Sequence, residues 1–441
     1  MMRKALTLAL LGGALLSAPA IARPDYAGDV KADYDKSLGA LWDHFHRNPE
    51  LSFREYKTAA RMAQELRAIP GMQVTEKVGQ TGVVGVLKNG DGPVVLVRAD
   101  MDGLPVQERS GLANASTVKQ VGIDGLEMPV MHACGHDVHI TSLVGTARQL
   151  ARMKDRWKGT VLFIVQPAEE RVGGADAMVK DGLYTRFPKP DYALAFHVAA
   201  ELETGKISAA EGIQYSSADS VDIRVPGIAT HGAAPHLGRD PVYIASQIVV
   251  GLQSIISREK GPLDAGVITV GAFHSGTKHN IISEYADLQV TVRSNSKDVR
   301  DKLIASIERV AVGIGRAHGL PEDKLPVVKV TESTPVTVND AALARRLNTA
   351  IGDALGKDVV VPFRQTNMGA EDFAFFVDPS FGIPGYYFAV GGTKPEWIAA
   401  AKNGGPPVAG HHSPLFKIDP EPSVRLGVEA MTAAVLDLLK K

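Results

Sequence analysis

The chain has 441 residues, of which 45% are hydrophobic, and a net charge of -1. At roughly 100–200 residues per domain, this length predicts about two domains with substantial cores. Without an excess of basic residues, neither nucleic acid nor an anionic membrane is an expected partner.

Residues 1–22 are predicted to form a signal peptide. Arg3 and Lys4 give a positive start, and residues 5–16 form an apolar run that is too short to span a bilayer. Ala20-Ile21-Ala22 is an A-x-A cleavage site. The sequence therefore predicts a periplasmic or secreted protein with no membrane anchor after cleavage. The alternative is an uncleaved N-terminal anchor helix.

The region after the signal alternates between helical patterns and short apolar runs. Such runs, when nearly continuous, indicate buried parallel strands. We expect strands at 94–100, 160–166, 191–197 and 385–390, and helices at 31–48, 55–69 and 139–153. This alternation predicts an open, mostly parallel α/β sheet with helices on both faces.

The first three of these strands run directly into polar residues of the types that bind metals. Asp100 and Asp102 follow the first strand, Glu169 and Glu170 follow the second, and His197 ends the third. Binding sites in open α/β sheets form outside the carboxyl ends of the strands. The sequence therefore places a polar site at this edge of the sheet.

The hydrophobic pattern changes near residue 214, where strands become alternating and therefore half-exposed. The expected order is strand, helix, two strands, helix and strand, at 220–225, 241–258, 266–273, 286–293, 297–318 and 327–330. This order is typical of a small two-layer domain. We therefore predict a catalytic domain in two parts, 23–213 and 334–441, interrupted by an inserted α+β domain at 214–333.

The segment 131–139 contains the only cysteine of the chain, Cys134, and three histidines. Thiolate and imidazole favour transition-metal ions. A bound ion would also compensate for drawing these polar groups together. Cys134 and His136 flank a glycine in a turn just before a helix, so both can reach one ion. The alternative is that Cys134 is a small buried hydrophobic residue.

Glu169 and Glu170 are adjacent carboxylates after a buried strand. On an extended segment they would point in opposite directions, so one could bind metal while the other faces a water that the metal activates. The alternative is a solvated charge pair. His197 and the pair His411-His412 are weak signals alone. Together with Cys134, His136 and Glu170, they offer enough ligands for two metals.

These residues lie in segments that resemble the dinuclear metallohydrolases of the aminoacylase and carboxypeptidase type. The similarity is closest to the branch of hippurate hydrolases, indole-acetyl-amino-acid hydrolases and N-acyl-amino-acid deacylases. The matching segments run in family order along the mature chain, at 98–105, 132–137, 166–170, 231–236, 369–373 and 412–414.

The resemblance implies two divalent metal ions per subunit, with manganese or zinc expected first and cobalt or nickel as alternatives. The metal ligands that it implies are Cys134, His136, Glu170, His197 and His412. It further implies Glu169 as the general base and acid. His412 is preferred to His411 because it immediately precedes the Ser-Pro step.

The resemblance also implies that the inserted domain mediates dimerisation. It implies that His231 polarises the scissile carbonyl, in its own subunit or across the dimer. Asn280 and Arg293 are the positions that would hold the carboxylate of the substrate, a task that suits a guanidinium. The alternative for Arg293 is a surface residue at the end of a strand.

The sequence thus predicts an exported, dimeric, two-metal amidohydrolase that cleaves N-acyl amino acids. A carboxypeptidase or dipeptidase with the same site is the alternative among enzymes. An exported binding protein without catalysis is the alternative outside them. The presence of Glu169 beside all five expected ligands disfavours the binding protein.

Overall fold

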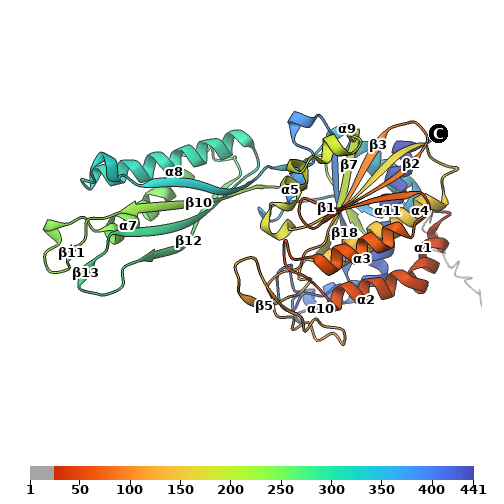
Figure 1. Ribbon diagram of the computed structural model, residues 1–441, viewed down its shortest axis with the longest axis horizontal. Coiled ribbons are helices and arrows are strands. Elements are labelled where there is room, and N and C mark those ends of the chain that lie inside the picture. The colour runs from red at the N-terminus through yellow and green to blue at the C-terminus, as the bar shows by residue number, and fades with distance from the viewer. Residues whose placement is uncertain (1–23) are drawn as a thin grey trace, which may run out of the picture.

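The structure, a computed structural model, describes residues 24–441 and consists of two lobes joined by a narrow neck (Figure 1). The larger lobe is built on an eight-stranded sheet and the smaller lobe on a four-stranded sheet. The expected signal peptide at residues 1–22 lies outside the described residues. Within residues 24–441, no helix is both long and apolar enough to cross a membrane.

The large sheet has the strand order β1-β2-β6-β3-β7-β18-β8-β17. Its inner strands β6, β3, β7 and β18 are mutually parallel, and β1 and β2 pair antiparallel at one edge. This confirms the predicted α/β class with a mostly parallel sheet. The strands are β1 Met72–Val78, β2 Gly82–Asn89, β3 Val94–Asp100, β6 Gly159–Gln166, β7 Tyr192–Glu203, β8 Ile207–Ser208, β17 Val360–Val361 and β18 Gly385–Thr393.

Helices cover both faces of this sheet and bury a separate hydrophobic core on each. The first core lies under α1 Ala27–Asp33, the π-helical turn Tyr34–Leu38, α2 Gly39–Arg47, α3 Tyr56–Arg67, α4 His136–Arg152, α9 Ala341–Leu355 and α11 Pro420–Leu439. The second lies under α5 Gly174–Lys180, α6 Leu183–Arg186 and the 3-10 turn Asp372–Phe375.

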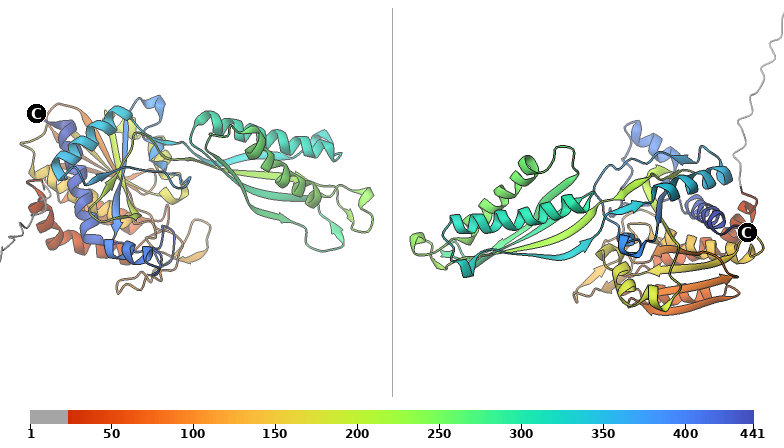
Figure 2. Two further views of the ribbon diagram at one scale, coloured as in Figure 1. Left: turned by 180° about the vertical axis from the view of Figure 1, so that it is seen from behind. Right: turned by 90° about the horizontal axis from the view of Figure 1, so that it is seen from above.

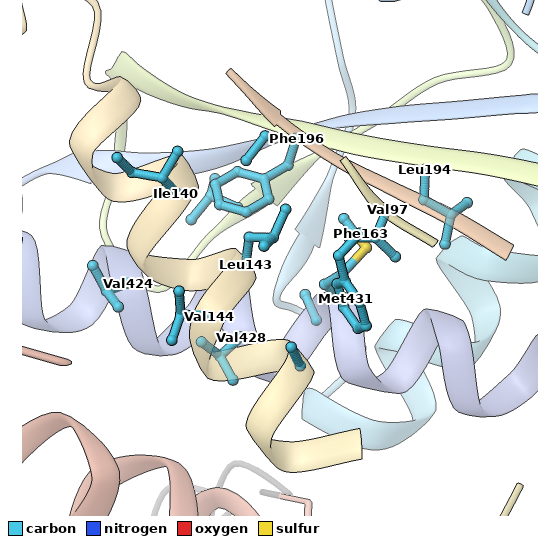
Figure 3. Packing of buried hydrophobic residues seen from close by; sticks show 14 of the residues in the cluster. Val97, Ile140, Leu143, Val144, Phe163, Leu194, Phe196, Val424, Val428 and Met431 are labelled. Atoms are coloured by element: carbon cyan, nitrogen blue, oxygen red, sulfur yellow. The ribbon is translucent and has the colours of Figure 1, made fainter. Parts of the chain in front are cut away.

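The first core holds α4 and α11 against the strands (Figure 3). Leu143 of α4 and Val428 of α11 are both buried, and Phe163 and Phe196 face them from β6 and β7. Each such side chain contributes about 1.5–3 kcal/mol when it is fully buried rather than exposed. This packing fixes the first turn of α4 above the carboxyl ends of the strands.

The smaller lobe has the predicted β-α-β-β-α-β order and the sheet order β12-β14-β10-β15. Both helices cover the same face of the sheet, as Figure 2 shows from above. Its elements are β10 Ser217–Pro226, α7 Pro241–Ser254, β12 Gly266–Ser275, β14 Tyr285–Ser294, α8 Lys297–Ala317 and β15 Val327–Thr334. The short antiparallel pair of β11 Thr230–His231 and β13 Ile281–Ile282 lies at the far tip of this lobe (Figure 1).

The remaining elements are short and connect the main ones. They are β4 Lys119–Val121, β5 Glu127–Pro129, β9 Gly212–Tyr215, β16 Thr337–Asn339, α10 Pro395–Lys402, the 3-10 turns Glu169–Arg171, Pro235–Leu237, Glu322–Lys324 and Pro379–Phe381, and the π-helical turn Ile255–Glu259. Several predicted boundaries differ from the structure, and two of them lie close to the expected metal ligands. The helix expected to begin at residue 139 begins at His136, and the strand expected to end at His197 continues to Glu203.

Candidate metal centre

All five side chains that the sequence predicts as metal ligands lie together at the carboxyl edge of the large sheet. Their ligand atoms fall into overlapping groups whose members lie within 4.8 Å of one another. One group joins Cys134, His136 and His197, and another joins Cys134, Glu170 and His412. Cys134 belongs to both groups, which is the position that a ligand shared by two ions would take.

The rings of His136 and His197 are held in the orientation expected of metal ligands. His136 donates its Nδ1 proton to the backbone carbonyl of Asp102 at 2.8 Å, and His197 donates to that of Val198 at 2.7 Å. Each ring thereby presents its Nε2, the nitrogen that would bind a metal, to the cluster. The Nε2 of His136 is buried and has no hydrogen-bond partner among the described residues.

The neighbouring histidines His411 and His412 differ in what they contact. His411 is held by the backbone, because its Nε2 accepts the N–H of Ala200 at 3.1 Å. The Nε2 of His412 lies 3.3 Å from a carboxylate oxygen of Glu170. The geometry therefore favours His412 as the ligand.

His139 is close to the centre but has no free nitrogen. Its Nδ1 donates to Asp100 at 2.5 Å, and its Nε2 accepts the N–H of Val198 at 2.8 Å. Burial lowers the pKa of His139 to about 3, so the ring stays neutral. We assign His139 a structural role between α4 and the sheet.

Glu169 and Glu170 do not lie on an extended segment. The expectation that an extended backbone turns their carboxylates in opposite directions was therefore wrong. Residues Glu169–Arg171 form a 3-10 turn. The carboxylate of Asp102 holds this turn by accepting the N–H of Glu169 at 3.0 Å and that of Glu170 at 3.1 Å. Asp102, which follows β3, thus fixes the backbone of the turn that follows the neighbouring strand β6.

The turn gives the two carboxylates different neighbours. Glu170 lies beside the metal-ligand candidates, with Oε1 3.8 Å from His136 Nε2. Glu169 also reaches a second acidic group, in which its carboxylate lies within 4.8 Å of those of Glu371 and Asp372. Both carboxylates thus lie within 4.0 Å of His136 Nε2, and Glu169 in addition meets the acidic pair.

The centre carries more negative charge than the protein alone stabilises. Burial raises the pKa of Glu169 well above its usual range, and the carboxylates of Glu371 and Glu170 add to this. Burial also raises the pKa of the Cys134 thiol, with a further increase from Glu170. Divalent cations would offset this charge and use the Nε2 atoms that face the cluster. The residues present therefore fit a metal centre.

A buried ionic network beneath the centre was not predicted from the sequence. Arg98 is fully buried, and its guanidinium lies 2.7 Å from Asp100 and 2.6 Å from Glu371. It also donates to Gln166 at 2.7 Å. An arginine inside an apolar strand requires buried acids around it. The position of Arg98 in an apolar strand therefore indicates buried acidic partners, although it does not identify Glu371 as one of them.

The residues expected to contact substrate lie in two places. His231 and Asn280 are exposed at the far tip of the smaller lobe, where the N–H of Gly232 donates to the carbonyl of Asn280 at 2.8 Å. Arg293 instead lines a cavity of about 280 Å³ that Glu170 also lines. Within one chain, only Arg293 is near the metal centre.

The guanidinium of Arg293 is open to a ligand. It makes no hydrogen bond or ion pair with another side chain among residues 24–441, and the nearby Asp219 is bound by Arg300 at 2.6 Å. A half-buried cation without a fixed partner can accept a carboxylate in a bidentate geometry.

Comparison with known proteins gives matches over most of the chain. The model of peptidase family M20/M25/M40 matches residues 96–435. The hippurate hydrolase of Campylobacter jejuni is 35% identical over 353 residues, which cover 79% of this chain and 86% of that protein. Thermostable carboxypeptidase 2 of Saccharolobus solfataricus is 36% identical over 351 residues, covering 78% of this chain and 83% of that protein.

A solved structure agrees with these sequence matches. The crystal structure of the Bacillus subtilis YxeP protein, described as a dinuclear metal-binding peptidase, aligns with a TM-score of 0.73 and 28% sequence identity. The alignment covers 92% of this chain and 99% of that one.

Proposed function

The chain belongs to peptidase family M20/M25/M40, and from this premise we propose that it removes the acyl group from N-acyl amino acids. It is a metal-dependent hydrolase that acts on amide bonds. The observation that carries the requirement for a free substrate carboxylate is the unpaired Arg293 guanidinium, which lines the same cavity as Glu170. The relative named a hippurate hydrolase supports the choice of an acyl amino acid. A substrate carboxylate bound there would leave its amide bond close to the metal ligands.

We propose that two divalent cations bind at Cys134, His136, Glu170, His197 and His412. When bound, the cations supply Lewis acidity, which lowers the pKa of a water and polarises the amide carbonyl. Manganese or zinc suits this mixed set of ligands, and cobalt or nickel are the alternatives.

Glu169 is the proposed proton carrier. Its buried carboxylate lies beside the ligands, and a carboxylate in this place can hold a proton between the two steps. It takes the proton of the attacking water at a carboxylate oxygen and delivers it to the amide nitrogen as the carbon–nitrogen bond breaks. The products are a carboxylic acid and a free amino acid.

His231 and Asn280 fit this reaction only as groups from a second subunit, because they lie at the tip of the smaller lobe in their own chain. We therefore propose a homodimer in which this lobe makes the contact and His231 polarises the carbonyl in the partner site. We also propose that the protein is exported, on the evidence of the charge and hydropathy of residues 1–22.

The second candidate function is that of a carboxypeptidase or dipeptidase. The relative named a thermostable carboxypeptidase favours it, and the relative named a hippurate hydrolase favours the deacylase, since hippurate is an N-acyl amino acid. Both reactions place a free carboxylate beside the scissile amide. Arg293 therefore serves either one.

A substrate panel tests the proposal. We expect kcat/KM to be higher for N-acyl amino acids than for dipeptides, when each is assayed with manganese, zinc, cobalt or nickel. Methyl esters of the same acyl amino acids should react poorly, and Arg293→Ala should lower kcat/KM for the free acids by about 10- to 100-fold. Arg224→Ala, an exposed arginine of the same sheet paired with Asp287, serves as the matched control.

Three results would contradict the proposal. Equal rates on acids and esters would show that no carboxylate is recognised. A preference for dipeptides would favour the second candidate function. Tight binding of acyl amino acids without turnover, in protein loaded with metal, would indicate a binding protein.

A further inference from the structure

The residue before the catalytic turn has an unusual backbone conformation. Ala168 is fully buried and has φ 47° and ψ 42°, in the left-handed region that residues with a Cβ atom rarely occupy. A conformation of this kind persists only when surrounding contacts hold it. Ala168 immediately precedes Glu169, so whatever holds Ala168 also directs the turn.

One buried carboxylate holds the N–H of Ala168, and the N–H of Gly174 donates to the Ala168 carbonyl at 3.2 Å. Glu55 has no exposed surface, and its Oε1 accepts the N–H of Ala168 at 2.9 Å and that of Phe53 at 2.8 Å. Its Oε2 accepts the hydroxyl of Thr81 at 2.6 Å. Glu55 thereby connects three segments of the chain: its own loop, the turn between β1 and β2, and the end of β6.

Glu55 and Asp102 act on consecutive amides. Glu55 accepts the N–H of Ala168, and Asp102 accepts the N–H groups of Glu169 and Glu170. Two buried carboxylates thus hold three successive N–H groups. The backbone of this turn can relax only if one of these bonds breaks.

We propose that Glu55 is a positioning residue for the reaction, holding Ala168 in its left-handed conformation so that the carboxylate of Glu169 points at the substrate side of the centre. Among the described residues, Glu55 makes no hydrogen bond or ion pair with the metal-ligand side chains, and it acts on the turn through the backbone. Its catalytic consequence rests on the proposed function, whereas its effect on the turn does not.

Hydrogen exchange of the metal-free protein tests the effect on the turn. In Glu55→Ala, the amides of Ala168, Glu169 and Glu170 should exchange about tenfold faster or more, because the bond that holds the first of them is lost. In Glu55→Gln, the side-chain carbonyl can still accept both backbone N–H groups. Exchange in this variant should therefore stay within about threefold of the wild type.

The rate of amide hydrolysis tests the consequence for catalysis. Glu55→Ala should lower kcat, per metal-loaded subunit, by about 10- to 100-fold with little change in KM, because a small displacement of a reacting group is costly. Glu55→Gln should recover most of that loss. If Glu55→Ala does not fold, Thr81→Val replaces it, and we expect smaller changes in the same direction.

Glu50→Ala is the matched control. Glu50 is a buried glutamate of the same loop, but its carboxylate accepts the N–H of Thr58 at the start of α3. Loss of the Glu50 carboxylate should lower the melting temperature. It should leave both kcat and the hydrogen exchange of the amides of residues 168–170 unchanged.

The proposal is overturned if Glu55→Ala leaves exchange at residues 168–170 unchanged, whatever happens to the rate. It is also overturned if exchange accelerates while kcat stays at the wild-type value. If the wild-type protein hydrolyses no acyl amino acid, the proposed function fails. The exchange experiment alone then decides whether Glu55 holds the turn.

Discussion

Glu169 and Glu170 have identical side chains and adjacent positions, yet they have different surroundings. Glu170 lies beside Cys134 and His412, whereas Glu169 also faces Glu371 and Asp372. We therefore expect Glu170→Gln to lower metal content and melting temperature. Glu169→Gln should retain metal and fold but lower kcat by at least ~10²–10⁴, since one group serves both proton transfers.

Metal analysis, thermal unfolding and kcat of both variants check this prediction. Loss of metal from Glu169→Gln together with retention by Glu170→Gln would reverse the two assignments. A wild-type kcat in Glu169→Gln would contradict the mechanism itself.

His46 should make the stability of the metal-free protein depend on pH. It is buried, 2.8 Å from Asp137 and 3.4 Å from Glu108. Burial alone would lower its pKa, but the bonds to these two carboxylates outweigh burial and raise the pKa to about 10. The native state therefore binds this proton more tightly than the unfolded chain, whose histidine has a pKa near ~6.5.

The stabilisation from His46 is complete below pH ~6.5 and is lost as the pH rises through about 10. We expect the free energy of unfolding of the wild type to fall between these values, and to fall less in His46→Gln. Denaturant unfolding at several pH values measures both slopes. Equal slopes would show that His46 is neutral in the native state.

At the scale of single residues, the sequence identified those whose chemistry is visible in short motifs. The five ligand candidates and Glu169 are of this kind, and the structure brings them together, although their roles remain predictions. Residues that act through distant partners were missed. Arg98 meets Glu371 across 273 positions, and Glu55 meets Ala168 across 113, and no local pattern encodes either contact.

The start of α4 depends on one glycine. Gly135 has φ 84°, and a Cβ atom there would lie 2.3 Å from a methyl group of Val198. Gly135→Ala should therefore destabilise the protein by more than the ~1–2 kcal/mol of a left-handed residue alone, and it should displace Cys134 and His136. Unfolding and metal titration measure the two effects. A variant with normal metal affinity would show that the turn does not set the ligand geometry.

A glycine in the same helix provides the control. Gly145 lies in the interior of α4, where a Cβ atom would meet Val428 at 2.5 Å but would not touch the ligand turn. Gly145→Ala should lower stability through this steric clash while preserving the affinity for metal per folded molecule.

Elements were predictable where hydrophobic periodicity is strong, as in the strands and helices of the smaller lobe. The start of α4 was missed because its first turn, from His136 to His139, is buried and polar, so it lacks the apolar spacing of an ordinary helix. The turn at Glu169–Arg171 was missed for another reason. The conformation of Ala168 is imposed by a tertiary hydrogen bond rather than by local sequence.

At the scale of the whole molecule, the distance between His231 and the metal centre makes assembly testable. If each site takes His231 from a partner, two defective chains can complement each other. Mixed dimers of Glu169→Gln and His231→Ala chains contain one complete site. Random reassembly should therefore restore roughly a quarter of wild-type activity, because about half of the dimers are mixed and each has one working site.

Activity after unfolding and refolding the two variants together, compared with each refolded alone, measures the complementation. Light scattering should show a dimer at micromolar concentration. A monomer, or no recovery on mixing, would contradict the cross-subunit role of His231.

The two chain segments that connect the smaller lobe to the larger lobe lie next to each other. Ala218 pairs with Thr334 in its sheet, and just beyond them Tyr215 of β9 pairs with Thr337 of β16. Because β9 and β16 are antiparallel, a tight turn could join them and leave the larger lobe continuous. A segment with adjoining ends can be acquired, exchanged or deleted as a unit. If the smaller lobe makes the dimer contact as proposed, recombination at this one pair of strands would alter assembly and substrate recognition together, while the metal-ligand residues of the larger lobe would stay in place.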